Sequence, residues 1–115
     1  MSVAVLIPVK AFAVAKVRLA PALSPHERAE LARSMATGVV AAAGDLPVTV
    51  VCDDDDVAAW ASDLGVAVAW TPGLGLDGAV MAGLAHLATA GVAWAMVVHA
   101  DLPLARDLAR LVPDD

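Results

Sequence analysis

The sequence is poor in aromatic and sulfur-containing side chains. Its 115 residues include one phenylalanine, no tyrosine, three tryptophans and one cysteine. The lone Cys52 cannot form an internal disulfide, and no basic segment precedes the first apolar stretch, so secretion is not indicated and we expect a cytoplasmic protein. Because 60% of the residues are hydrophobic, largely alanine and valine, we expect one globular domain over residues 1–115 that packs through small side chains.

Basic residues are also scarce. Seven lysines and arginines stand against 13 aspartates and glutamates, which gives a net charge of -6. This balance repels phosphate backbones and argues against nucleic-acid binding. Residues 79–100 contain no charged side chain other than histidine and are long enough to span a bilayer. However, their pattern changes at Gly91 from helical spacing to a valine-rich run, which predicts a helix followed by a buried strand rather than a membrane segment.

Short apolar runs alternate with segments of helical spacing along the chain. The apolar runs predict four strands, and the spacing predicts a helix between each pair of successive strands. The predicted strands cover residues 2–9, 47–52, 66–70 and 93–98, and the predicted helices cover about 24–44, 57–64 and 76–90. This order implies right-handed crossovers and a mostly parallel sheet with helices on its faces, an α/β fold.

Two of the helix starts carry capping signals. Ser24, Pro25 and Glu27 form a capping box, in which the serine and glutamate side chains satisfy free backbone N–H groups. The four aspartates at 53–56 are typical of helix capping and of the N-terminal helix dipole. Leu31, Met35 and Val39 recur every four positions in the first predicted helix. We expect them to form the face that packs against the sheet.

The unusual polar residues follow the carboxyl ends of the predicted strands. In an open parallel sheet these ends share one edge, and ligands bind there. Four loops meet at this edge: residues 10–18, the aspartate run from Asp53, residues 72–78 and residues 99–101. The sequence therefore predicts one binding site at this edge.

The first of these loops carries Lys10, Lys16 and Arg18, three of the seven basic residues. Three cations on one loop suit a triphosphate, whose oxygens need positive charge from several directions. The loop is not a Walker loop, because it lacks the glycines that let backbone N–H groups wrap phosphates. The alternative interpretation, solvated loop cations, is weaker for three cations within nine residues than for a lone lysine.

Two further loops offer ligand-binding groups. Asp101 directly follows a predicted buried strand, where a carboxylate is a good ligand for Mg²⁺; a helix cap or turn before Pro103 is the alternative. The glycines of TPGLGLDGA, residues 71–79, let the backbone approach a flat ligand such as a purine base, although glycines also form ordinary turns. The residues expected to be structural are Cys52 in the core, His26 and His86 on exposed helix positions, and Trp60, Trp70 and Trp94 in the core or an interface.

Four segments together resemble the 2-phospho-L-lactate or phosphoenolpyruvate guanylyltransferases of coenzyme F-420 biosynthesis. These segments are IPVKAFAVAKVRLAPALSPHER, VVCDDD, TPGLGLDGAV and HADLPL, in that order along the whole chain. The resemblance implies a three-layer Rossmann-like nucleotidyltransferase fold related to the molybdenum-cofactor guanylyltransferases. It also implies an enzyme that uses GTP and Mg²⁺ to place GMP on a phosphorylated three-carbon acid, with release of pyrophosphate.

The resemblance further implies roles for individual residues. Lys10, Lys16 and Arg18 would bind the GTP phosphates, Asp101 would bind Mg²⁺, and Lys16, Arg18 and Asp101 would be catalytic. Asp53 would lie close to the nucleoside. The loop that holds the guanine would contribute Pro72, Gly75, Leu76 and Asp77. In this loop the family usually has asparagine at the position of Asp77, so the contact made there is expected to differ.

The family's members are typically nearly twice as long as this chain. We therefore expect it to correspond to their amino-terminal half, with weak or no turnover by itself and with self-association through exposed apolar surface or a free sheet edge. Two other readings of the residues stay open. One is a nucleotidyltransferase of the same fold that acts on a molybdopterin or sugar phosphate, and the other is a non-catalytic α/β binding module.

Overall fold

The computed structural model describes residues 2–15 and 19–100. These residues form an α/β fold in which every predicted strand and helix is present. In chain order the elements are β1 (Val3–Pro8), the short 3-10 helix η1 (Phe12–Val14), α1 (Pro25–Ala42), β2 (Val48–Cys52), α2 (Asp55–Asp63), β3 (Ala67–Trp70), α3 (Gly75–Thr89) and β4 (Trp94–Val97).

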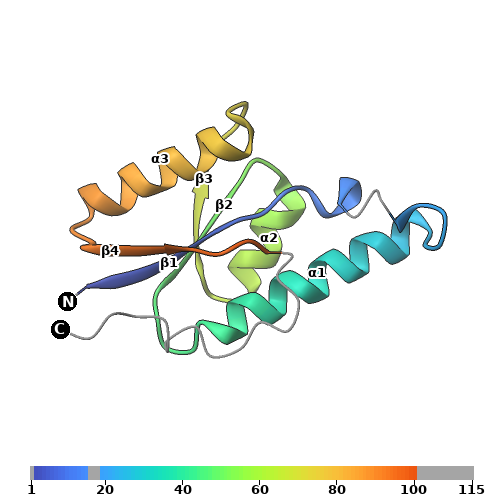
Figure 1. Cartoon of the computed structure of the whole chain (residues 1–115), viewed down its shortest axis with the longest axis horizontal. Helices are drawn as coiled ribbons and strands as arrows, with labels where there is room; N and C mark the ends of the chain where they lie inside the picture. Colours follow the sequence, from blue (N-terminus) through green and yellow to red (C-terminus); the bar gives the residue numbers. More distant parts are fainter. Residues whose placement is uncertain (1, 16–18, 101–115) are drawn as a thin grey trace.

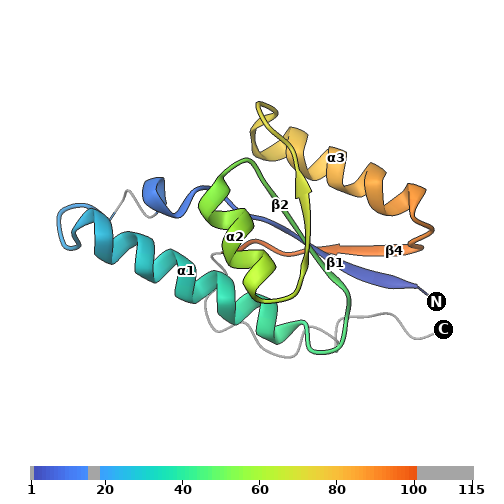
Figure 2. The same ribbon diagram turned by 180° about the vertical axis from the view of Figure 1, so that it is seen from behind.

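The four strands form one parallel sheet in the order β3-β2-β1-β4. From β1 the chain moves outward to β2 and β3, and then crosses back to place β4 on the other side of β1. Because parallel crossovers are right-handed, this reversal puts α1 and α2 on one face and α3 on the other (Figures 1 and 2). The predicted three-layer, Rossmann-like α/β architecture is confirmed.

The central strand β1 is buried on both faces. Val5 and Ile7 pack in the cluster beneath α1 and α2, whereas Ala4 and Leu6 pack in the cluster beneath α3. Alternate residues of a strand point to opposite faces, so one short segment belongs to both cores. This is why β1 reads in the sequence as a continuous apolar run.

The two predicted capping signals are confirmed. The Glu27 backbone N–H donates to Ser24 Oγ at 3.1 Å, and the Ser24 backbone N–H donates to Glu27 Oε1 at 2.8 Å. These hydrogen bonds lower the pKa of the Glu27 carboxyl below its usual value. Asp54 caps α2 by accepting from the Val57 backbone N–H at 3.1 Å, so one residue of the acidic run has the structural role expected of it.

The prediction for the inward face of α1 was wrong for two of three residues. Val39 is fully buried, but Leu31 and Met35 are only partly buried. The residues of α1 that are buried against the sheet are Ala32, Ala36 and Val39. In a helix this rich in alanine, hydrophobicity does not distinguish the inner face from its neighbours, and here small side chains face inward because they allow the helix to lie close to the sheet.

The tryptophans do not share one environment. Trp60 is buried in the core as expected, but Trp70 and Trp94 are 50% and 49% exposed on the two outer strands of the described sheet. They are not core residues, and their place in an interface stays a prediction, as does self-association. Residues 79–100 form most of α3, a turn and β4, as predicted, and none of the helices in the described part of the chain has the length and hydrophobicity needed to cross a membrane.

Helix α3 lies close to the sheet because of Gly83. A Cβ atom at this position would lie 2.9 Å from Leu6 Cδ1 and 2.9 Å from Val51 Cγ2, closer than real contacts of this kind. Gly83 therefore sets the distance between α3 and the strands β1 and β2. Gly38 in α1 is a natural comparison, since a Cβ there would meet nothing within 4 Å.

We expect Gly83→Ala to lower the free energy of unfolding by about 1–2 kcal/mol, because overpacking costs roughly 1–3 kcal/mol and only about 0.5–1 kcal/mol returns through helix propensity. Gly38→Ala should raise the same free energy by about 0.5–1 kcal/mol. Urea unfolding of both variants checks the pair. Stabilisation of both variants would contradict the tight approach at Gly83.

Candidate functional site

A cavity of about 190 Å³ lies at the carboxyl ends of β1, β2 and β3, beside the first turn of α3. This is the edge of the sheet at which the sequence predicts a binding site. The residues that line the cavity are Val9, Lys10, Val51, Cys52, Asp53, Thr71, Gly75, Leu76 and Ala79. The wall is mostly apolar, with a few polar groups that come from separate strands.

Four of the predicted site residues meet in this wall, namely Lys10, Asp53, Gly75 and Leu76. They come from the ends of two strands, β1 and β2, and from the start of α3, and the parallel sheet brings these together. Two other predicted residues, Pro72 and Asp77, are exposed and belong to the same loop and helical turn, but they do not line the cavity. Lys16, Arg18 and Asp101 lie outside the described residues, so their predicted roles stay predictions.

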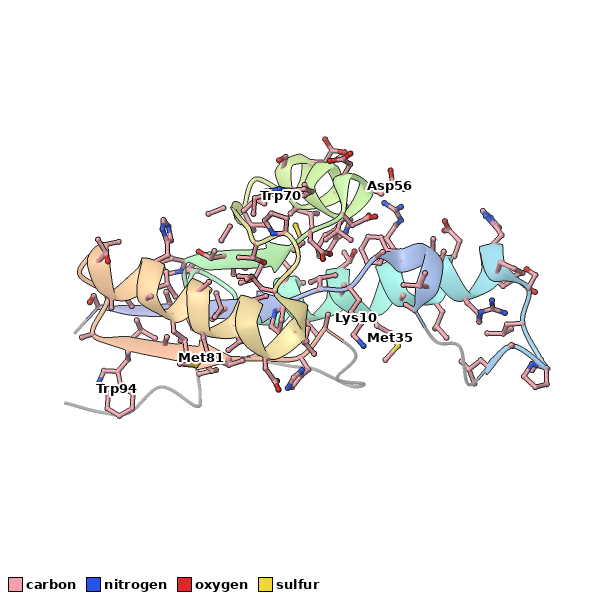
Figure 3. All side chains as sticks on the ribbon, turned by 90° about the horizontal axis from the view of Figure 1, so that it is seen from above. Lys10, Met35, Asp56, Trp70, Met81 and Trp94 are labelled. Carbon is pink, nitrogen blue, oxygen red and sulfur yellow. The ribbon has the colours of Figure 1, made fainter. Side chains whose placement is uncertain are left out.

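Lys10 is placed by the chain on either side of it. The Val9 backbone N–H donates to the Val51 carbonyl at 3.0 Å, which continues the pairing of β1 with β2 up to the cavity. Two residues after Lys10, the buried Phe12 of η1 anchors the loop. Lys10 is exposed where the chain leaves the sheet (Figure 3), and none of the described carboxylates forms an ion pair with it. Its charge is therefore available to a ligand.

The Phe12 anchor joins three elements. Its ring meets Trp60 of α2 edge-on, with 5.4 Å between ring centroids, and the Arg33 guanidinium of α1 lies 4.9 Å from the Phe12 centroid. Trp60 Nε1 in turn donates to Thr37 Oγ1 of α1 at 3.0 Å. Such aromatic and cation–π contacts add to the burial of the ring. They fix the start of the cation-bearing loop against both helices.

The loop from β3 to α3 brings backbone rather than side chains to the cavity. Gly73 and Gly75 have φ angles of 72° and 69°, which residues with a Cβ rarely adopt. This conformation brings Gly75 and Leu76, the first residues of α3, to the cavity wall. The residue before the helix, Leu74, provides no side-chain cap. The N–H groups of the first turn are therefore left for water or a ligand.

The acidic run divides between structure and site. Asp54 caps α2, while Asp53, one residue earlier, is exposed and lines the cavity. A carboxylate in the wall accepts hydrogen bonds and disfavours an anion in the same space. Asp53 therefore favours a group with N–H donors beside it over a phosphate, whereas Lys10 in the same wall attracts an anion.

Sequence reasoning assigned no role to Thr71, which is 7% exposed and lines the cavity. Its backbone N–H donates to the Cys52 carbonyl at 2.9 Å, and its hydroxyl donates to the same oxygen at 3.4 Å. The available signal was its position, since a threonine directly after a strand and before a Pro-Gly turn must end at the same sheet edge. This position does not distinguish a threonine with a role in the site from one that only forms the turn.

Cys52 is a buried core residue, as predicted, and also reaches the cavity wall. Burial raises the pKa of its thiol above the ordinary value of 9.0. A hydrogen bond from the Asp54 backbone opposes this increase, and the negative charges of Asp53 and Asp54 add to it. The thiol is therefore protonated at neutral pH and is a poor nucleophile.

The described residues contain no group of three or more histidine, cysteine, aspartate or glutamate side chains placed to hold a metal ion. This finding does not count against Mg²⁺, which is commonly held by one or two carboxylates together with substrate phosphates and water. The one carboxylate predicted for that role, Asp101, lies beyond the described part of the chain.

Comparison with known proteins gives a consistent family. Residues 3–112 match the family model described as "Guanylyl transferase CofC like". The chain is 39% identical over 106 residues to a phosphoenolpyruvate guanylyltransferase of Mycolicibacterium smegmatis. The aligned residues cover 87% of this chain and 48% of that protein. It is 39% identical over 107 residues to the protein of the same name from Salinispora arenicola, with coverage of 89% and 49%.

A third relative matches more closely over a shorter stretch. The phosphoenolpyruvate guanylyltransferase of Sanguibacter keddieii is 51% identical over 59 residues, which cover 48% of this chain and 21% of that protein. The chain thus spans about half the length of the relatives that it matches along most of its sequence.

The Cys52 thiol should react with iodoacetamide at pH 8 at least about tenfold more slowly in the folded chain than in the urea-unfolded chain, because it is buried and protonated.

Since the folded-state pKa of Cys52 is raised, the contribution of its thiol to stability is complete below pH 9 and is lost as the pH rises toward the folded-state value. Unfolding of the parent and of Cys52→Ala at pH 7 and pH 10 checks this, with the variant as control for other titrations. Rapid alkylation at pH 8 would contradict the buried, protonated state.

Proposed function

Because the chain belongs to the CofC-like guanylyl transferase family, we propose that it provides the GTP-binding part of a guanylyltransferase. In this proposal GMP passes from GTP to phosphoenolpyruvate or 2-phospho-L-lactate, with release of pyrophosphate, in the biosynthesis of coenzyme F-420. The observation that carries the proposal is the 39% identity over 87% and 89% of the chain to two proteins named phosphoenolpyruvate guanylyltransferase. Their names favour this acceptor class over a molybdopterin or sugar phosphate. A cytoplasmic location remains part of the proposal.

The cavity supports a division of GTP between two places. Pockets that enclose a whole small ligand commonly measure about 300–1,000 Å³, so a cavity of about 190 Å³ has room for one part of a nucleotide. Its apolar wall and the Asp53 carboxylate suit the base better than the triphosphate. Lys10, which lines the cavity at the end of β1, would then bind the phosphates together with Lys16 and Arg18 of its loop.

The reaction needs no side-chain nucleophile. An oxygen of the acceptor's phosphate forms a bond to the α-phosphorus of GTP while the bond from the α-phosphorus to the bridging oxygen breaks, and that oxygen leaves with pyrophosphate. The lysines and the arginine neutralise charge on the triphosphate and on the leaving group, so positioning and electrostatics would supply most of the rate. Mg²⁺, held by Asp101 and the phosphates, would supply further positive charge there.

Replacement of Lys10 by methionine tests the phosphate contact. We expect the Kd for GTP to rise about 10- to 100-fold, because a charge-assisted hydrogen bond contributes roughly 1.5–3 kcal/mol. Lys10→Arg keeps the charge and should remain within about threefold of the parent. Calorimetric titration of the 115-residue chain with GTP at two salt concentrations gives both values. Equal affinity of Lys10→Met and the parent would remove Lys10 from the proposal.

The role of Asp101 is tested by the dependence of GTP binding on Mg²⁺. The parent should bind GTP more tightly in Mg²⁺ than in EDTA, and Asp101→Asn should lose most of this gain, since the amide binds the ion more weakly. Asp63→Asn is the matched control, because Asp63 is exposed at the far end of α2. An undiminished gain in Asp101→Asn would show that the ion is held elsewhere.

A further inference from the structure

Thr71 is the buried polar residue of the cavity wall to which neither the sequence nor the proposed reaction gives a role. It follows β3 directly and is 7% exposed. Its backbone N–H bonds to the Cys52 carbonyl at 2.9 Å, which extends the β2–β3 pairing by one residue and fixes the position of its side chain. A hydroxyl group is thus held at the end of the sheet where the cavity begins.

Thr71 lines the cavity, and its hydroxyl oxygen can accept hydrogen bonds as well as donate one. Its hydrogen is directed to the Cys52 carbonyl, at 3.4 Å, which is long compared with the usual 2.5–3.0 Å between two oxygens. The lone pairs of Oγ1 have no donor among the described residues. A buried oxygen in this state gains a hydrogen bond when a ligand brings an N–H group to it.

The first turn of α3 presents the opposite polarity. Helices α1 and α2 begin with side-chain caps from Ser24 and Asp54, whereas α3 has none. Gly75 and Leu76 of this turn line the same cavity as Thr71. The cavity therefore has N–H donors on the α3 side, the Lys10 ammonium at the end of β1, and acceptors from Thr71 and Asp53 on the β2–β3 side.

This arrangement of donors and acceptors matches one purine better than the other. Guanine carries the acceptor O6 next to its N1–H and 2-amino donors, whereas adenine carries an amino donor where guanine has O6 and an acceptor at N1. With guanine, O6 faces the N–H groups of α3 and the ring donors face oxygen atoms. With adenine, a donor faces donors and an acceptor faces acceptors, which leaves buried groups unpaired.

We propose that Thr71 is a specificity-determining residue for the base of the nucleotide: its oxygen accepts a hydrogen bond from the N1–H or 2-amino group of guanine, while the uncapped start of α3 donates to O6. The inference rests on the proposed function, because it takes the cavity to hold the base of GTP. It goes beyond that function by assigning base discrimination to a residue with no part in the phosphate chemistry.

A purely structural role for Thr71 makes a different prediction. If its hydroxyl served only to finish the β2–β3 pairing, its removal would weaken folding and lower the affinity for every nucleotide in the same proportion. The ratio of affinities for GTP and ATP is therefore the quantity that separates the two roles.

The experiment measures the Kd of GTP and of ATP for the 115-residue chain and for Thr71→Val, Thr71→Ser and Thr89→Val. Valine keeps the shape of the side chain and removes the oxygen, and serine keeps the oxygen. Thr89 is an exposed threonine at the end of α3, whose hydroxyl bonds to the Ala85 carbonyl, so its variant controls for the exchange itself. We expect Thr71→Val to bind GTP about tenfold more weakly with ATP binding nearly unchanged.

Thr71→Ser and Thr89→Val should keep the parent's ratio of GTP to ATP affinity. If Thr71→Val does not fold, as judged by its thermal transition, Thr71→Ala takes its place, since it lacks the same oxygen. An unchanged ratio in the variant without the oxygen overturns the role of Thr71 while the proposed function stands. A parent chain that shows no preference for GTP over ATP overturns the proposed function and this inference with it.

Discussion

The burial of β1 from both faces of the sheet is the constraint on which the rest of the structure depends. Val5, Leu6 and Ile7 are completely buried, and burying side chains of this size contributes roughly 1.5–3 kcal/mol each. Because these residues alternate between the two cores, β1 can only lie in the middle, with helices on both sides. Its carboxyl end must then open at the point where the chain reverses direction. Lys10 lies there because its strand has no other place in the sheet.

Small side chains bring the outer layers close enough to form a site. Buried alanines of α1 and Gly83 of α3 leave little between the helices and the sheet. Because α3 lies close to the sheet, its first turn reaches the carboxyl ends of β1 and β2. The small side chains between α3 and the sheet thus allow the first turn of α3 to form part of the cavity wall.

The candidate site brings opposite charges into one cavity wall in an acidic protein. Asp53 faces the cavity and Asp54 caps α2, while Lys10 stands at the same strand ends and begins a loop that carries two more cations. In the proposed arrangement, the carboxylate and the hydroxyl oxygen on the strand side and the uncapped N–H groups on the helix side would bind the base, and Lys10 would bind the phosphates. A nucleotide has both parts that such a site needs, a base with N–H donors and a polyanionic tail.

The sequence by itself determined the order of the elements, the caps of α1 and α2, and the strand ends from which the site is built, because these depend on local patterns of hydrophobicity and hydrogen bonding. The resemblance to the family also pointed to Asp53, Gly75 and Leu76 as site residues, and all three line the cavity. Only the tertiary structure decided which face of α1 packs inward, since alanines give no contrast between faces. It alone placed Thr71 in the wall and left Pro72 and Asp77 outside it. Neighbours along the chain point in different directions once a loop folds, and which direction leads into a cavity depends on helices and strands that are distant in sequence.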